Sequence, residues 1–244
     1  MNKAAIFDLD GTIYFGNSLA DGAKEVLEAL KQKGYEVLFF TNNSTKTRDE
    51  VLQKLSALGI KSDENRIYTS AYATAKYLQE VGLKKIFLIG NESFQKELQS
   101  CKIELTDELS CEAVVVGLDL YFNYEKIAKG FLALQNGAKL IATNVDKHFP
   151  VENGILKPGS NAIVASLLGC SGKNVDYIVG KPNTYLLDMI VKEWYLDRDQ
   201  IWVVGDSEES DIAMANNYGC KSVLVANTHI SLRDALKMIQ GEQI

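Results

Sequence analysis

Short apolar runs that end in Gly, Asn or Asp recur along the whole chain, and they constrain the fold more than any other feature. The runs are KAAIFDLD, YEVLFFTNN, KIFLIGN, EAVVVGLD, AKLIATN, DYIVGKP, IWVVGD and KSVLVAN. Buried parallel strands have this length and composition. Between the runs, apolar residues recur at helical spacing, as in Ala23, Val26, Leu27 and Leu30, and in Leu187, Ile190, Val191 and Trp194. The sequence therefore predicts an α/β fold with a largely parallel sheet.

Composition excludes several classes of protein. A chain of 244 residues with 46% hydrophobic content can bury a full core in one large domain or two modest ones. A net charge of −6 argues against a nucleic-acid partner, since that binding requires many Lys and Arg. No apolar run approaches the roughly 18 residues of a membrane span, and Asp8 and Asp10 interrupt the place of a signal peptide's apolar region. The four cysteines form no CxxC pair. We therefore expect a cytoplasmic protein with no membrane partner.

Reactive side chains follow four of the predicted strands. They are Asp8 and Asp10, Thr41 with Asn42 and Asn43, Lys181, and Asp206 with Asp211. Ligands of open parallel sheets bind beyond the carboxyl ends of the strands, so we expect these groups to converge. Together they supply what phosphoryl transfer needs, namely a nucleophile, metal ligands and donors to phosphate oxygens. Asp8, Asp206 and the main-chain carbonyl of Asp10 are oxygen ligands of the kind that Mg²⁺ prefers.

Each of these groups also has an ordinary structural interpretation. The two aspartates of the first run and the TNN stretch are common turn residues. Lys181 could be a solvated lysine at a helix start, although a cation is unfavourable at the positive end of a helix without an anion nearby. Residues 207–211, Ser-Glu-Glu-Ser-Asp, could be only an acidic cap of the following helix. Four such coincidences in one chain are improbable, so the functional interpretation is favoured.

The stretches DLDGT, TNN, GKP and GDSEESD resemble, in this order, the four motifs of the haloacid dehalogenase-like hydrolase superfamily. The long segment between TNN and GKP contains ATNVDKHFP and PGSNAI, and it resembles the NagD-like, para-nitrophenyl phosphatase branch. The resemblance implies a Rossmann-like core of residues 1–81 and 179–244 with an inserted α/β cap of residues 82–178. Two departures stand out: Ser210 replaces a common Thr, and relatives commonly continue through another strand where this chain ends at Ile244.

Carried over position by position, the resemblance implies a Mg²⁺-dependent phosphatase that acts on a small phosphorylated metabolite. Asp8 would be the nucleophile and would form an aspartyl-phosphate, and Asp10 would be the general acid and base. The phosphate ligands would be Thr41, Asn42, Asn43 and Lys181, and the metal ligands would be Asp8, Asp10 and Asp206. Asp211 would hold Lys181 or a metal-bound water.

The stretch ATNVDKHFP predicts a polar loop over residues 145–149 at the strand edge of the cap. The resemblance implies that this edge faces the core site, so Asp146 and His148 would hydrogen-bond the organic part of the substrate. The alternative is a solvated loop with no ligand role.

Other function classes remain alternatives at this point. A receiver-like phosphoacceptor module also places Asp, Thr and Lys at the edge of a parallel sheet, and a catalytically silent binding protein could share the fold. A P-loop enzyme does not fit, because LLGCSGKN lacks the first glycine and the final Ser or Thr. The substrate is not named by the sequence, and a homodimer is left open.

Overall fold

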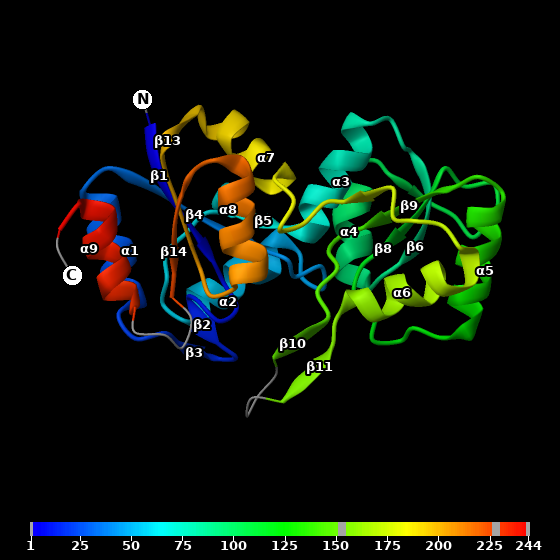
Figure 1. The fold of residues 1–244 in the computed structure, drawn as a ribbon, viewed down its shortest axis with the longest axis horizontal. Helices are drawn as coiled ribbons and strands as arrows, with labels where there is room; N and C mark the ends of the chain where they lie inside the picture. Colours follow the sequence, from blue (N-terminus) through cyan, green and yellow to red (C-terminus); the bar gives the residue numbers. More distant parts are fainter. Residues whose placement is uncertain (1, 151–154, 226–229, 243–244) are drawn as a thin grey trace. The chain divides into compact units, whose positions relative to one another are not determined.

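The structure is a computed structural model, and it describes residues 2–150, 155–225 and 230–242. Contacts divide the chain into two compact units (Figure 1). Unit 1 comprises Met1–Thr41, Arg48–Tyr68 and Lys181–Ile244, and unit 2 comprises Asn42–Thr47 and Thr69–Gly180. The predicted domain boundaries, a core of 1–81 and 179–244 and a cap of 82–178, stay a prediction. The two compact units are divided at other residues, because residues 42–47, 69–81 and 179–180 make most of their contacts within unit 2.

Unit 1 contains a five-stranded sheet in the order β14-β13-β1-β4-β5. Its strands are β1 (Asn2–Asp8), β4 (Tyr35–Thr41), β5 (Ile67–Thr69), β13 (Leu196–Gly205) and β14 (Lys221–Leu224). Strand β1 is parallel to both β4 and β13, and β13 is parallel to β14. A small antiparallel hairpin of β2 (Tyr14–Phe15) and β3 (Ser18–Leu19) follows β1. The parallel strands place their carboxyl ends at one edge of the sheet.

The helices of unit 1 are α1 (Ala23–Gln32), α2 (Arg48–Ala57), α7 (Tyr185–Trp194), α8 (Ala213–Tyr218) and α9 (Leu232–Gln240). A short 3₁₀ helix, Glu64–Arg66, precedes β5, and a π-helical turn, Glu208–Ile212, precedes α8. The apolar spacing predicted for α1 is correct, because all four of its predicted residues are buried. Helix α9 begins with a capping box in which Ser231 and Asp234 bond each other's main-chain N–H groups.

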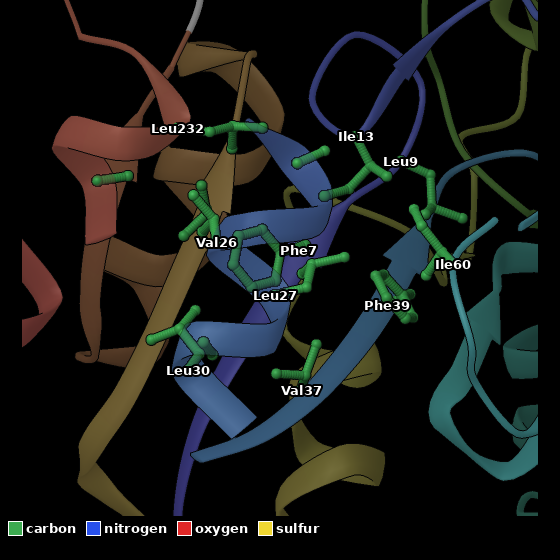
Figure 2. Close-up of a cluster of buried hydrophobic side chains, with 14 of the residues drawn as sticks. Phe7, Leu9, Ile13, Val26, Leu27, Leu30, Val37, Phe39, Ile60 and Leu232 are labelled. Atoms are coloured by element: carbon green, nitrogen blue, oxygen red, sulfur yellow. The ribbon is translucent and has the colours of Figure 1, made fainter. Parts of the chain in front are cut away.

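One hydrophobic cluster fills the face of the unit 1 sheet that α1 and α9 cover (Figure 2). Phe7 and Phe39 come from neighbouring strands, and Leu27 and Leu30 come from α1. Ala4 and Ile6, which alternate with these residues along β1, point to the opposite face and are also fully buried. Burial on both faces explains why the strands are continuous apolar runs rather than alternating ones. It also leaves the carboxyl edge of the sheet as the place for polar groups.

Unit 2 contains a second five-stranded sheet, in the order β12-β9-β8-β6-β7, whose strands are all parallel. They are β6 (Lys85–Ile89), β7 (Glu104–Leu105), β8 (Ala113–Val116), β9 (Lys139–Ala142) and β12 (Tyr177–Ile178). The helices are α3 (Ser70–Glu80), α4 (Glu92–Ser100), α5 (Tyr124–Gln135) and α6 (Ser160–Ser171). The side chains of Thr69, Asn91 and Asn123 cap α3, α4 and α5 by accepting from main-chain N–H groups. An antiparallel pair of β10 (His148–Pro150) and β11 (Leu156–Pro158) completes the unit.

All eight apolar runs contain a strand in the structure, so the predicted α/β class is confirmed. The loop predicted over residues 145–149 is wrong in part, because His148 begins β10 and pairs with Pro158. Pairing with β11 thus makes a strand of the end of the segment that was expected to be a loop. Among the described helices, none has the length and apolar character that a membrane crossing would need.

Candidate active site

Strand register brings three of the predicted site residues to one edge of unit 1. Asp8 is the last residue of β1 and lies opposite Phe40 of β4, so Thr41 is one residue further along. On the other side, Phe7 lies opposite Val204 of β13, so Asp206 follows just beyond the end of that strand. Asp8 and Thr41 are both buried, and Asp206 is partly buried. The convergence expected from the ends of the strands is therefore present in unit 1.

Lys181 lies between two carboxylates at this edge. Its Nζ is 2.5 Å from Asp8 Oδ1 and 2.6 Å from Asp211 Oδ1. The ammonium also stands 4.4 Å from the centroid of the Phe40 ring. All three charged side chains are almost completely buried, so the attraction within the two ion pairs is little screened by solvent, but burying the charges has its own cost. Lys181 is thus held by anions, in agreement with the unfavourable position of a cation before a helix.

Asp211 uses both of its carboxylate oxygens within unit 1. Oδ1 accepts from Lys181, and Oδ2 accepts from the main-chain N–H of Ser207 at 3.0 Å. The π-helical turn Glu208–Ile212 creates this geometry by folding Asp211 back toward the end of β13. Such turns often occur at functional sites. The hydroxyl of Ser207 caps the same turn by accepting from the Ser210 N–H at 3.2 Å, so part of the acidic stretch does have the capping role considered above.

Negative charge exceeds positive charge at this cluster. Asp8, Asp206 and Asp211 each place an oxygen within 4.8 Å of the others, while Lys181 is the cation that contacts two of them. Burial raises the pKa of Asp8 well above its ordinary value, and the lowering effect of Lys181 does not offset it. Burial also raises the pKa of Asp206, with a further increase from the nearby Asp211. Burial acts to lower the pKa of Lys181, but Asp211 and Asp8 outweigh it and keep the ammonium charged.

Asp206 is held close to the loop that follows β1. The Thr12 hydroxyl donates to Asp206 Oδ1 at 3.3 Å. Gly11 has a positive φ of +97°, and a Cβ at this position would lie 2.3 Å from Asp206 Oδ2. Only glycine combines that backbone conformation with such a close approach. The presence of Gly11 and Thr12 in the DLDGT stretch is therefore explained by their packing against Asp206.

Asp10 differs from Asp8 in being exposed. The Tyr14 hydroxyl lies 3.5 Å from Asp10 Oδ2, and the Lys54 ammonium lies 3.8 Å from Asp10 Oδ1. Lys54 also stands over the Tyr14 ring, 3.6 Å from its centroid. Burial is the largest cause that raises the pKa of Tyr14, and the negative charge of Asp10 is the second, so the phenol keeps its proton. The sequence analysis did not include Thr12, Tyr14 and Lys54 in the site. Thr12 could have been found from its hydroxyl next to the two aspartates, whereas no pattern in the sequence connects Lys54 of α2 with Asp10.

The donor set of this cluster fits a hard divalent cation. It consists of carboxylate oxygens that are close together and carry more negative charge than one lysine neutralises. Mg²⁺ binds through one or two carboxylates, water and phosphate oxygens, so Asp8 and Asp206 suffice as side-chain ligands. Asp211 is already engaged by Lys181 and Ser207.

Asn42 and Asn43 belong to unit 2 and bond within it. The amide of Asn42 donates to both carboxylate oxygens of Asp146, each at 3.1 Å. The Asn43 side chain accepts from the main-chain N–H and the hydroxyl of Thr45, both at 2.7 Å, which is the turn geometry that the ordinary interpretation of TNN expected. Phosphate binding by the two asparagines stays a prediction.

The two cap residues chosen from sequence have different surroundings within unit 2. Asp146 is partly buried and bonded to Asn42, whereas His148 is exposed on β10. Their contact with substrate stays a prediction.

Comparisons with known proteins agree with this geometry. The model of the haloacid dehalogenase-like hydrolase family matches residues 5–104, and a HAD-hydrolase-like model matches residues 178–242. Phosphoglycolate phosphatase 1A from Arabidopsis thaliana is 36% identical over 256 residues, which cover 94% of this chain and 70% of the relative. Acid sugar phosphatase from Staphylococcus aureus is 34% identical over 233 residues, which cover 95% and 89%.

Solved structures are also similar along almost the whole chain. A structure described as a putative nagD protein has a TM-score of 0.89 at 30% identity and covers 94% of this chain and 91% of its own. The 4-nitrophenylphosphatase of Thermotoga maritima has a TM-score of 0.91 at 28% identity and covers 98% of both chains. Glycerol phosphate phosphatase of Mycobacterium tuberculosis, in complex with magnesium, has a TM-score of 0.83 at 30% identity and covers 91% of this chain and 68% of its own. The chain therefore belongs to the haloacid dehalogenase-like hydrolase superfamily, in its NagD-like branch, with a Rossmann-like core and an inserted α/β cap.

Proposed function

We propose that this enzyme hydrolyses small phosphate monoesters with Mg²⁺, through a phosphate group transferred to Asp8. Its class is that of the relatives, a phosphoric monoester hydrolase. The observation that carries the proposal is the buried Asp8 carboxylate, held through Oδ1 by Lys181 beside the carboxylates of Asp206 and Asp211. A receiver-like module is not supported, because the models that match residues 5–104 and 178–242 are both of hydrolases.

In the first step, Asp8 Oδ2 attacks phosphorus in line with the leaving oxygen. The bond between phosphorus and that oxygen breaks, and the carboxyl of Asp10 gives its proton to the leaving alkoxide. Lys181 donates to the phosphate oxygens, and the Thr41 hydroxyl is a second donor. The exposure of Asp10 suits this role, since the group must reach both the leaving oxygen and water.

In the second step, Asp10 takes a proton from water as the water oxygen attacks the aspartyl-phosphate. The bond between Asp8 and phosphorus breaks, inorganic phosphate leaves, and the Asp8 carboxylate is restored. Asp211 acts by orienting Lys181 through the bond at 2.6 Å. Mg²⁺ held by Asp8, Asp206 and the main-chain carbonyl of Asp10 would neutralise charge on the phosphate oxygens when bound.

The substrate is proposed as a small phosphorylated metabolite. The names of the relatives indicate phosphoglycolate, sugar phosphates and glycerol phosphate as the first compounds to assay. The cytoplasmic location and the absence of a nucleic-acid partner stay expectations from the sequence. The oligomeric state is open to measurement by light scattering.

The proposal is tested by trapping the phosphoenzyme. We expect acid-quenched enzyme, taken during turnover of para-nitrophenyl phosphate with Mg²⁺, to carry phosphate on the peptide that contains Asp8. The Asp10→Asn variant should accumulate more of this species with para-nitrophenyl phosphate, because a good leaving group departs without the acid but water still needs the base. Turnover without any phosphopeptide would contradict covalent catalysis by Asp8.

A further inference from the structure

Asp146 makes a directed contact to the TNN stretch within unit 2. Both of its carboxylate oxygens lie 3.1 Å from the side-chain amide nitrogen of Asn42. Its main chain is fixed as well, since its N–H donates to Asn144 Oδ1 at 3.1 Å and its carbonyl accepts from the Asn161 N–H at 3.2 Å. Asp146 is therefore a firmly held acceptor, and its charge makes the bond to Asn42 stronger than a neutral one.

Asn42 is the residue at which the chain leaves β4 and enters unit 2. Besides its bond to Asp146, its main-chain carbonyl accepts from the Ser70 hydroxyl and from the Asn144 amide, both at 2.7 Å. The next residue toward the N-terminus is Thr41, one of the proposed phosphate donors. The position of Asn42 therefore constrains the main chain that carries Thr41.

The same asparagine also packs against the point where the chain returns to unit 1. Gly180 precedes Lys181, and a Cβ on Gly180 would lie 2.5 Å from Asn42 Oδ1 and 2.5 Å from the carbonyl of Thr143. The Gly180 N–H donates to that carbonyl at 2.8 Å. The amide nitrogen of Asn42 thus contacts Asp146, and its amide oxygen lies close to Gly180, the residue just before Lys181.

We propose that Asp146 is a positioning residue, which acts through Asn42 to fix the two points of the chain that carry Thr41 and Lys181. This role rests on the proposed phosphatase function and differs from contact with the organic part of the substrate. In the proposed function Thr41 and Lys181 contact the phosphate group, which all substrates share. Loss of Asp146 must then lower turnover of every phosphate ester by the same factor.

The test compares Asp146→Ala with the wild type on a panel of esters that includes para-nitrophenyl phosphate. We expect kcat/KM to fall about tenfold on every ester, with most of the loss in kcat, since small misplacements of catalytic groups are costly. Asp146→Asn should recover most of the activity, because its side-chain oxygen can still accept from Asn42. The control is Lys147→Ala, which removes an exposed side chain next to Asp146 and should leave all rates unchanged.

A double-mutant cycle isolates the contact. Asn42→Ala should lose a similar factor, and the double variant Asn42→Ala with Asp146→Ala should be no worse than the poorer single variant. Losses that multiply in the double variant would overturn the proposal. So would a loss confined to particular esters, which would instead indicate direct contact of Asp146 with the organic group.

Hydrogen exchange gives a readout that does not require turnover. In Asp146→Ala, the peptide covering residues 42–47 should exchange faster, while peptides from β6 and β8 should not change. Unchanged exchange over residues 42–47 would overturn the positioning role. If the wild type showed no turnover of any ester, the proposed function would fail, and hydrogen exchange alone would decide whether Asp146 fixes Asn42.

Discussion

Both units place a buried aspartate at or just beyond the carboxyl end of a central parallel strand, but they neutralise it differently. In unit 2, Asp119 follows β8 and accepts from Lys126 Nζ at 2.5 Å and from the Tyr121 N–H at 2.9 Å. In unit 1, Asp8 shares Lys181 with Asp211, and the Asp206 carboxylate lies beside them. In unit 2 one carboxylate has one lysine, whereas in unit 1 two carboxylates share one lysine and a third carboxylate lies close to both.

This difference separates a structural ion pair from a site that needs a ligand. The pair in unit 2 is complete by itself, and its lysine is about one-third exposed, so its contribution to stability is small. The excess of negative charge in unit 1 is unfavourable unless a carboxyl keeps a proton or a cation binds. The comparison indicates that charge balance, rather than burial of an aspartate, distinguishes the edge at which the reaction is proposed.

Among the changes that test this difference between the units, Asp8→Asn should have the largest effect on turnover. We expect turnover to fall roughly a thousandfold or more, because the amide keeps the shape and removes the nucleophile. The melting temperature should not fall, since one of the crowded carboxylates is gone. Asp119→Asn is the matched control in unit 2, and it should keep turnover while losing about 1 kcal/mol of stability. A variant of Asp8 that retained a tenth of the wild-type rate would contradict the assignment.

Removal of metal should be the next largest effect. EDTA is expected to abolish turnover, and Mg²⁺ should restore it. Ca²⁺ should not, because its larger and looser coordination can engage both oxygens of Asp8 and block attack. Full activity with Ca²⁺ in a steady-state assay would argue against Asp8 serving as both ligand and nucleophile.

Lys181→Met should lower stability far more than Lys126→Met. Among the ion pairs of the described residues, Lys181 is the only cation that contacts Asp8 and Asp211. Its removal leaves two buried carboxylates without a cation, so we expect the free energy of unfolding in EDTA to fall by about 3 kcal/mol or more. The partly exposed Lys126 should cost less than about 1 kcal/mol when replaced. Urea denaturation of the two variants measures both values, and equal losses would remove the distinction between the units.

The pH dependence of stability should be the smallest effect. In EDTA, the folded pKa values of Asp8 and Asp206 are raised above 3.8, so the native state binds more protons than the unfolded state. The free energy of unfolding should therefore fall as pH rises from 3.8 through the folded values. Lys181 adds no slope there, because its raised pKa matters only above 10.5.

The Asp8→Asn variant should show a shallower slope than the wild type in the same titration, and saturating Mg²⁺ should flatten the wild-type curve. Denaturation followed by circular dichroism between pH 5 and 8 (about the range where most folds survive) checks the sign. Stability that rises with pH in EDTA would mean that the carboxylates are better stabilised by their neighbours than burial allows.

Much of the fold could be predicted from the sequence because buried parallel strands are continuous apolar runs. The runs that contain β1, β4 and β13 also ended in the residues that meet at the site. Strands β5, β10 and β11 were missed because they are three residues long and carry no periodicity. The hydrogen bonds of Asn42 could not be predicted. Its partners Ser70, Asn144 and Asp146 are distant in sequence, and only the tertiary fold brings them to it.

The grouping of residues 42–47 with unit 2 has a consequence for recombination between relatives. The Ser44 hydroxyl accepts from the Leu118 N–H at 3.0 Å, and the Asn91 amide donates to the Thr45 carbonyl at 2.8 Å. A chimera that exchanges only residues 69–180 would pair a foreign insert with a native six-residue segment and would break these bonds. A crossover design that transfers 42–47 together with 69–180 keeps each donor with its acceptor, so the exchangeable module of this enzyme is two pieces of chain rather than one.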